Sequence, residues 1–281
     1  MIKTKSLSIK NGTGNNINVD FWYIENSVNL PVMIFCHGFK GFKDWGGFPY
    51  MFEKFAEAGF FIVSFNFSHN GVGESGEDLK NFTRLDLFAK NTFSKELDDL
   101  GNVIDFLETN AKNYNYDFSK LILAGHSRGG GIAILKSAED KRISKLITLA
   151  SVADFDRYSE QRKAEWKKRG YVEVMNTRTK QLMRMDYTLI DDLEKNRGRL
   201  NIPEALEKID IPVLIIHGRE DLAVDYSDAE MIYNTGDKSK RELILQENTG
   251  HTFGIVHPFE GSNPVFENII SECVNFSKKQ I

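Results

Sequence analysis

Short apolar runs alternate with stretches of helical spacing along most of the chain. Continuous apolar runs are typical of parallel strands that are buried on both faces of a sheet. Such runs lie at residues 32–36, 60–67, 121–124, 145–150, 213–217 and 242–245. Helices are expected between and after them, at residues 48–58, 94–110, directly after 127, and 264–279. This alternation predicts an α/β fold with a mainly parallel sheet covered on both faces by helices.

Two further strands are expected before the first of these runs. Residues 6–10 and 19–24 both have strand character, and Asn11, Gly12, Thr13 and Gly14 lie between them. Glycine and asparagine are typical of tight turns, so the two strands are predicted to form an antiparallel hairpin.

The alternation of strands and helices is interrupted once. Residues 151–203 separate two core strands by many more residues than an ordinary crossover connection contains. Long connections in compact domains are usually functional. We therefore predict a single α/β core, residues 1–150 and 204–281, with an inserted cap, residues 151–203, between the sixth strand and the following helix. A surface insertion without function is the alternative. The cap is expected to contain helix-forming residues at 154–169, a pair of strands at 170–175 and 181–186, and a helix at 191–199.

The pattern G-x-S-x-G occurs at residues 125–129, between an apolar strand and a helix start. A serine in a tight strand-to-helix turn needs small neighbours, because the backbone on both sides approaches closely. The hydroxyl of Ser127 is then expected at the carboxyl edge of the sheet, near the positive end of the following helix. This placement predicts a nucleophile.

A serine nucleophile needs a base and an acid that orients the base. Asp221 follows the strand at 213–217, and His251 follows the strand at 242–245. The chain order Ser, Asp, His is the one expected when all three groups follow strands of such a sheet. Ser127, Asp221 and His251 are therefore predicted to form a catalytic triad.

Other groups compete for two of these roles. Glu220 is the main competitor for the acid, while Asp225 and Asp228 lie further along the chain. His257 precedes a proline beyond the turn and is a weaker candidate for the base than His251.

Donors for a developing oxyanion are expected from two backbone N–H groups. His37, Gly38 and Phe39 directly follow a buried strand, so the Phe39 N–H is one predicted donor. The other is the N–H of Arg128, the residue after the nucleophile. His37 is expected to brace its loop, and a structural glycine-rich loop is the alternative reading of this segment.

Composition and charge argue against a nucleic-acid-binding protein and against a membrane-spanning protein. Net charge is −4, which does not favour a nucleic-acid partner, and no apolar stretch is long enough for a membrane span. Cys36 and Cys273 are expected to be reduced and buried in a cytoplasmic protein. No spaced His/Cys cluster predicts a metal, and no glycine-rich run is followed by the Lys-Ser/Thr of a phosphate loop. A homodimer is compatible with these features.

On these motifs the chain resembles the α/β-hydrolase superfamily, from the strand at 32–36 to the final helix. It is most similar to the dienelactone-hydrolase-like and cinnamoyl (feruloyl) esterase-like branch. The resemblance rests on residues 37–39, 73–75, 125–130, 217–221 and 250–251. It implies a carboxylic ester hydrolase with an acyl-enzyme intermediate, an inserted cap that shapes the pocket, and no cofactor. The chain departs from the pattern at residues 66–71, where relatives often carry an acidic residue and a Gly-His-Gly run.

The expected substrate is a small to medium ester, with an apolar or aromatic acyl group. The pocket is predicted from aromatic and methionine residues, although the same residues could simply pack the cap onto the core: Trp45, Trp166, Tyr171, Met183 and Met185. Basic residues at 162–169 are read as a solvated helix face that could also attract an anion. An amide or thioester hydrolase with the same triad, and a small-molecule receptor on this fold, are the competing functions.

Overall fold

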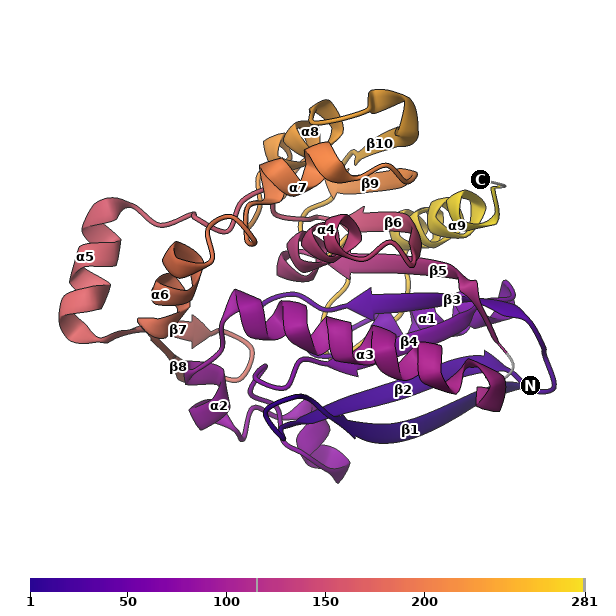
Figure 1. The fold of residues 1–281 in the computed structure, drawn as a ribbon, viewed down its shortest axis with the longest axis horizontal. Helices are drawn as coiled ribbons and strands as arrows, with labels where there is room; N and C mark the ends of the chain where they lie inside the picture. The colour runs from indigo at the N-terminus through magenta and orange to yellow at the C-terminus, as the bar shows by residue number, and fades with distance from the viewer. Residues whose placement is uncertain (115, 280–281) are drawn as a thin grey trace.

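The computed structural model describes residues 1–114 and 116–279 (Figure 1). Its main sheet has eight strands in the order β1-β2-β4-β3-β5-β6-β9-β10. The strands are β1 (Ile2–Lys10), β2 (Asn16–Ile24), β3 (Leu30–Cys36), β4 (Phe61–Asn66), β5 (Tyr116–His126), β6 (Ile143–Leu149), β9 (Val213–Gly218) and β10 (Arg241–Gln246).

Strands β1, β2 and β4 pair antiparallel, and every later pairing in this sheet is parallel. The predicted N-terminal hairpin is therefore present as β1 and β2. Asn11 closes its turn, because its side-chain oxygen accepts the N–H groups of Thr13 and Asn15 at 3.1 and 2.9 Å. The prediction of a mainly parallel α/β sheet is confirmed.

Helices cover both faces of the sheet. The α-helices are α1 (Phe48–Glu57), α2 (Leu85–Ala89), α3 (Phe93–Tyr114), α4 (Arg128–Glu139), α5 (Glu160–Arg169), α6 (Thr188–Lys195), α7 (Ile202–Lys208), α8 (Ser227–Asn234) and α9 (Pro264–Lys278). Short 3-10 helices span Gly76–Lys80 and Lys238–Lys240. Helices α1 and α9 bury their apolar residues on one face, and α3, α4, α7 and α8 bury theirs on the other.

The alternation of β3 shows how the two layers are built. Val32, Ile34 and Cys36 point to the α3–α4 layer, whereas Met33 and Phe35 point to the α1 layer. All five are almost fully buried. Burial of one such side chain contributes about 1.5–3 kcal/mol, so a strand that is apolar at every position is held from both sides.

The segment between β6 and α7 carries α5, α6 and a separate two-stranded sheet of β7 (Tyr171–Asn176) and β8 (Gln181–Asp186). These elements lie together at one end of the molecule, beside α2 (Figure 1). The two strands match the sequence prediction. The helices differ from it: α5 begins only at Glu160, where Ser159 caps it, and α6 begins at Thr188 instead of residue 191.

Three short helices have bounds that were not predicted from the sequence: α2, α7 and α8. Each has eight residues or fewer, so its apolar pattern is too short to separate from a loop. Both cysteines are free and buried, as expected. Within residues 1–114 and 116–279, no helix has the length and apolar character needed to cross a bilayer.

Candidate active site

Ser127 stands at a sharp turn between β5 and α4. Its backbone has φ 57° and ψ −122°, and its N–H donates to the carbonyl of Leu149 at 2.9 Å. The neighbouring glycines permit this turn: a Cβ on Gly125 would lie 2.3 Å from the carbonyl oxygen of Gly129, and a Cβ on Gly129 would lie 2.3 Å from that of Cys36. Larger residues at either position would force the turn apart. The strained turn directs the serine side chain out of the sheet.

Three predicted catalytic side chains meet at this edge of the sheet. His251 Nε2 lies 3.0 Å from Ser127 Oγ, and His251 Nδ1 lies 2.7 Å from Asp221 Oδ2. The three residues follow β5, β9 and β10, whose carboxyl ends share one edge. The imidazole therefore bridges hydroxyl and carboxylate, which is the arrangement that proton transfer from a serine requires.

The Asp221 carboxylate accepts hydrogen bonds at both oxygens. Its Oδ1 accepts the N–H groups of Ala223 and Val224 at 2.8 and 2.9 Å, and its Oδ2 also lies 3.1 Å from His217 Nε2. Burial acts to raise the pKa of the Asp221 carboxyl, but the hydrogen bonds from His217, His251 and Val224 outweigh burial and hold that pKa well below its usual range. The carboxylate therefore stays ionised while it faces His251.

None of the four competing groups lies in this arrangement. Glu220 is exposed, and its N–H donates to Thr249 while its carboxylate does not contact His251. His257 Nδ1 accepts the N–H of Gly46 at 2.8 Å, away from Ser127. Asp225 turns back onto the N–H of Ser227, and Asp228 pairs with Arg157 at 2.7 Å.

The loop after β3 lies directly against the serine. A Cβ on Gly38 would lie 2.9 Å from Ser127 Cβ, so only glycine lets the loop approach this closely. The Gly38 carbonyl accepts the Gly41 N–H at 3.0 Å and the His37 Nδ1–H at 2.9 Å. Since the carbonyl is held on one side, the N–H of the same peptide unit, that of Phe39, is directed to the other.

His37 is fixed in one neutral form. Its Nε2 faces two donors at 3.3 Å, the N–H of Phe67 and the amide of Asn70, so Nε2 accepts and Nδ1 carries the proton. Burial lowers the pKa of His37 to about 4, so the ring is neutral near pH 7. This agrees with the bracing role expected from the sequence.

The two expected oxyanion donors are free to bind a ligand. Among the described residues, neither the Phe39 N–H nor the Arg128 N–H donates to another protein group. The Arg128 guanidinium lies 4.1 Å from the centre of the Phe39 ring and pairs with the buried Glu96 at 3.5 Å. The side chain of Arg128 thereby holds the loop that carries Phe39 in place.

Two cavities open on either side of Ser127, and both are bordered by Phe39, Lys40 and His251. The Trp45 cavity, of about 490 Å³, has walls that include Trp45, Phe48, Arg178, Ile255 and His257. The Phe155 cavity, of about 370 Å³, has walls that include Phe93, Val152, Phe155, Tyr158 and Val224. A substrate with two arms can extend into both from the serine between them.

Of the five predicted pocket residues, Trp45 lines a cavity beside Ser127, and the other four line neither of these two cavities. Trp166 is fully buried and donates from Nε1 to the Met185 carbonyl at 3.1 Å, and Met183 and Met185 are buried beside it. Tyr171 packs against the guanidinium of Arg169 at 4.2 Å. These side chains hold the inserted segment together, which corrects their assignment to the pocket. The segment reaches the Trp45 cavity through residues 176–178 instead.

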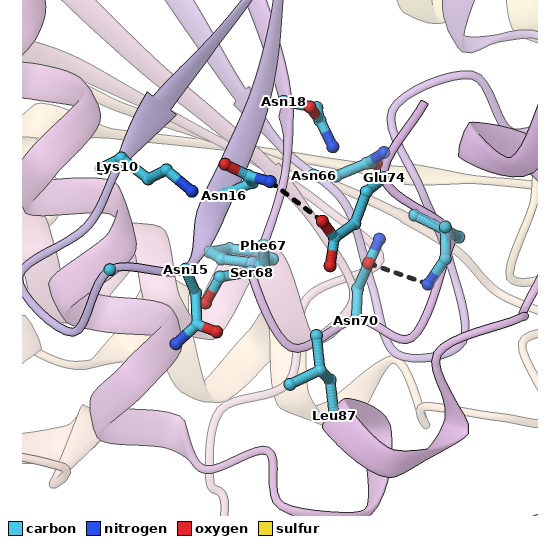
Figure 2. A pocket seen from close by; sticks show the side chains of 13 residues that line it. Lys10, Asn15, Asn16, Asn18, Asn66, Phe67, Ser68, Asn70, Glu74 and Leu87 are labelled. Carbon is cyan, nitrogen blue, oxygen red and sulfur yellow. Dashed lines mark hydrogen bonds between the residues drawn. The ribbon is translucent and has the colours of Figure 1, made fainter. Parts of the chain in front are cut away.

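Two asparagines within residues 66–71, where the sequence departs from the pattern of the family it resembles, support the oxyanion loop. Asn66 Oδ1 accepts the Lys43 N–H at 2.8 Å, and Asn70 contacts His37. A small polar cavity of about 80 Å³ lies beside residues 66–74. Figure 2 shows Asn16 donating to Glu74 across it. Its walls include none of the triad residues, so it is separate from the Ser127 site.

Sequence reasoning missed two histidines of the site. His126 Nε2 donates to the main-chain oxygen of His251 at 2.9 Å, and His217 contacts Asp221 from the buried end of β9. Burial, followed by the proximity of His251, lowers the pKa of His126 to about 3, so this ring is neutral. Only their positions in the sequence could have pointed to them. His126 ends β5 just before Ser127, and His217 lies near the end of β9, which Asp221 follows.

A model of the BD-FAE family matches residues 84–235, more than half of the chain. The chain belongs to the BD-FAE family. BD-FAE is a family of α/β-hydrolase esterases, so this BD-FAE protein is a hydrolase of the esterase type. The match contains Ser127 and Asp221 and ends before β10 and His251.

Proteins similar to this BD-FAE member over their whole length carry little sequence identity. An uncharacterised 31.7 kDa protein of the traX-finO intergenic region of Escherichia coli is 23% identical, over 94% of this chain and 96% of that protein. Among solved structures, the α/β hydrolase GrgF from Penicillium sp. sh18 has a TM-score of 0.73 at 17% identity, covering 98% of both chains. Est1E from Butyrivibrio proteoclasticus, solved with ferulic acid, has a TM-score of 0.71 at 18% identity, covering 96% of this chain and 97% of its own. These structures show that the fold is that of an α/β hydrolase, as predicted.

Proposed function

We propose that the protein is a serine carboxylic ester hydrolase that works through an acyl-enzyme intermediate. The observation that carries this proposal is the continuous contact from Ser127 Oγ through His251 to Asp221, at 3.0 and 2.7 Å, at the meeting point of two cavities. Membership of an esterase family supports it.

In the first step, Ser127 Oγ attacks the ester carbonyl while His251 Nε2 takes the hydroxyl proton. Asp221 orients the imidazole and stabilises its positive charge, and its low pKa keeps it from taking the proton itself. The N–H groups of Phe39 and Arg128 donate to the carbonyl oxygen as negative charge develops there.

His251 then returns the proton to the leaving alcohol as the C–O bond breaks. A water molecule, deprotonated by the same imidazole, attacks the acyl-enzyme. As the second tetrahedral intermediate collapses, the bond to Ser127 Oγ breaks, His251 returns the proton to that oxygen, and the carboxylic acid leaves. The aromatic walls of both cavities suit a small to medium ester with an aromatic or apolar arm.

We further propose that residues 151–203 act as a cap over this site. Lys40 Nζ donates to the Met175 carbonyl at 3.1 Å, and Gln181 donates to the Phe82 carbonyl at 3.0 Å, so the β7–β8 hairpin is attached to the core on both sides of its turn. Its turn residues then form one wall of the Trp45 cavity.

The test compares wild type with Ser127→Ala on short-chain and long-chain nitrophenyl esters, a hydroxycinnamate methyl ester and an aminoacyl anilide. Ester turnover is expected in wild type and should be lost in a folded Ser127→Ala variant. Ser68→Ala is the matched control, because Ser68 Oγ also lies 2.8 Å from a histidine, His69, but outside the site. Turnover of the anilide would favour an amide hydrolase, and turnover that survives in Ser127→Ala would refute the proposed nucleophile.

A further inference from the structure

Arg178 carries a positive charge into the Trp45 cavity without an acidic partner. It lies in the turn between β7 and β8, with its guanidinium 5.4 Å from the Phe42 ring centre and 5.6 Å from that of Phe82. Its Nη2 is buried, and within the part of the chain that the structure describes this atom has no hydrogen-bond acceptor. A guanidinium packed on aromatic rings but lacking an acceptor is prepared for one.

Lys40 also lines this cavity. Its ammonium donates only to the main-chain oxygen of Met175, and no carboxylate of residues 1–114 or 116–279 lies within 4 Å of it. Other cations around the site are paired: Arg128 with Glu96 at 3.5 Å, and Arg157 with Asp228 at 2.7 Å. The lack of a counter-charge is therefore a property of the Trp45 cavity and not of the whole active-site edge.

The rest of the cavity wall adds donors and no negative charge. Its described lining contains no aspartate or glutamate. His257 accepts the Gly46 N–H at Nδ1, so its neutral ring carries the proton on Nε2. Burial, followed by the charges of Arg178 and Lys80, lowers the pKa of His257, which is the response expected in a field of positive sign.

Burial also lowers the pKa of Lys40 and that of Arg178, because both cations have lost part of their hydration. A half-buried cation without a partner is destabilising for the folded protein unless something else compensates it. A carboxylate that enters the cavity would neutralise the charges of Arg178 and Lys40, and charge-assisted hydrogen bonds to it would be stronger than those a neutral group makes.

We propose that the Trp45 cavity binds a carboxylate on one arm of the ester, so that the protein selects half-esters or other esters carrying an anionic group. Arg178 and Lys40 are the residues that recognise it, and the Phe155 cavity takes the other, neutral arm. This inference rests on the proposed ester hydrolysis and adds the charge of the substrate to it.

The basic helix α5 does not supply positive charge to either cavity beside Ser127. Lys163 pairs with Asp156 at 2.6 Å and Arg169 pairs with Glu173 at 2.9 Å, so two of its cations already have partners. The residues of α5 do not line either cavity beside Ser127. Selection by charge is therefore assigned to the hairpin turn and the oxyanion loop.

The experiment uses two pairs of esters that differ only in charge. In the first pair the carboxylate is on the acyl side: mono-4-nitrophenyl adipate against its methyl-capped diester. In the second it is on the alcohol side: 3-carboxyphenyl butyrate against its methyl ester. In one of the two pairs, kcat/KM of the anionic ester is expected to exceed that of the neutral ester by about tenfold. High salt should lower this ratio of kcat/KM values, because it screens the attraction between the charges.

Arg178→Gln and Lys40→Gln should each lower that ratio by about tenfold, the effect of losing one charge-assisted hydrogen bond. Lys180→Gln is the control, and it should leave the ratio unchanged. Lys180 and Lys40 both have φ of 56°, so the two substitutions place glutamine on the same backbone conformation. Lys180 is exposed and lines neither cavity.

The experiment distinguishes failure of the carboxylate site from failure of the proposed ester hydrolysis. The carboxylate site is refuted if the kcat/KM ratio is near one in both pairs, or if Arg178→Gln and Lys40→Gln leave the preference unchanged. In that case Ser127-dependent turnover of the neutral esters still supports the proposed hydrolase function. If no ester is hydrolysed, the proposed function fails. Calorimetry of monomethyl adipate binding to the Ser127→Ala variant then tests whether the Trp45 cavity binds a carboxylate. Binding that is lost on adding Arg178→Gln supports the site, and absence of binding refutes it.

Discussion

His126 donates a hydrogen bond from Nε2 to the main-chain oxygen of His251, across 2.9 Å. The residue before the proposed nucleophile therefore holds the backbone of the proposed base. Their rings also lie close, with centres 4.8 Å apart. Because burial keeps the His126 ring neutral, this contact positions His251 without adding charge beside it.

Removal of this hydrogen bond should misalign the base. His126→Leu is expected to lower kcat for ester hydrolysis by about tenfold to a hundredfold with little change in KM, because proton transfer depends on geometry more than substrate binding does. His126→Gln keeps an N–H donor and should recover part of the loss. Equal losses in the leucine and glutamine variants, measured by steady-state kinetics, would assign His126 to packing alone.

Asp221→Asn tests which acid orients His251. The amide keeps the size of the side chain but removes the charge that stabilises protonated His251, so kcat should fall by roughly 10³–10⁴. Glu220→Gln is the matched control, since Glu220 is adjacent, exposed and outside the triad contacts, and it should leave kcat within about twofold. A larger loss from Glu220→Gln than from Asp221→Asn would reverse the assignment.

Gly38→Ala should damage the site through a single methyl group. Its Cβ would lie 2.9 Å from Ser127 Cβ, so the oxyanion loop must retreat and carry the Phe39 N–H with it. Loss of one oxyanion donor lowers kcat by about 10²–10³. Gly12→Ala, in the first hairpin, meets no atom within 4 Å and should leave ester hydrolysis unchanged. Full activity in Gly38→Ala would show that the loop tolerates the displacement.

His37 should make stability fall in acid. Burial holds its folded-state pKa at about 4, against about 6.5 when exposed. As the pH drops from 6.5 to 4, the unfolded chain binds a proton that the folded chain excludes, so folding loses up to about 3 kcal/mol. No further loss from this group is expected below pH 4.

The measurement is the free energy of urea unfolding at pH 7.5 and pH 4.5. His37→Gln stays neutral and can still bond to both Gly38 and Phe67, so the variant should lose less stability between the two values than wild type does. Other groups, including Asp221 and His126, titrate in both proteins and cancel in the comparison. An identical loss in the two proteins would mean that His37 is not kept neutral by the fold.

Much of the fold could be read from local patterns. The run Phe61–Asn66 is mostly apolar because both faces of the strand are covered: all six residues are buried, and only Ser64 and Asn66 are polar. A pattern of this kind can be recognised within six residues. The turn around Ser127 is equally local, since Gly125 and Gly129 are required by contacts within the turn and with the neighbouring strand end. The short helix α2 was not predicted, because five residues are too few to show a helical period.

What the sequence by itself determined is the strand alternation, the turn at Ser127 and the chain order of Asp221 and His251. These follow from periodicity and from the shared edge of parallel strands. Only the tertiary structure decided that Met183 and Met185 pack the inserted segment while Arg178 reaches the cavity. Residues distant in the chain meet through packing of whole elements, so the face that a side chain presents to a cavity is set by neighbours that no local pattern contains.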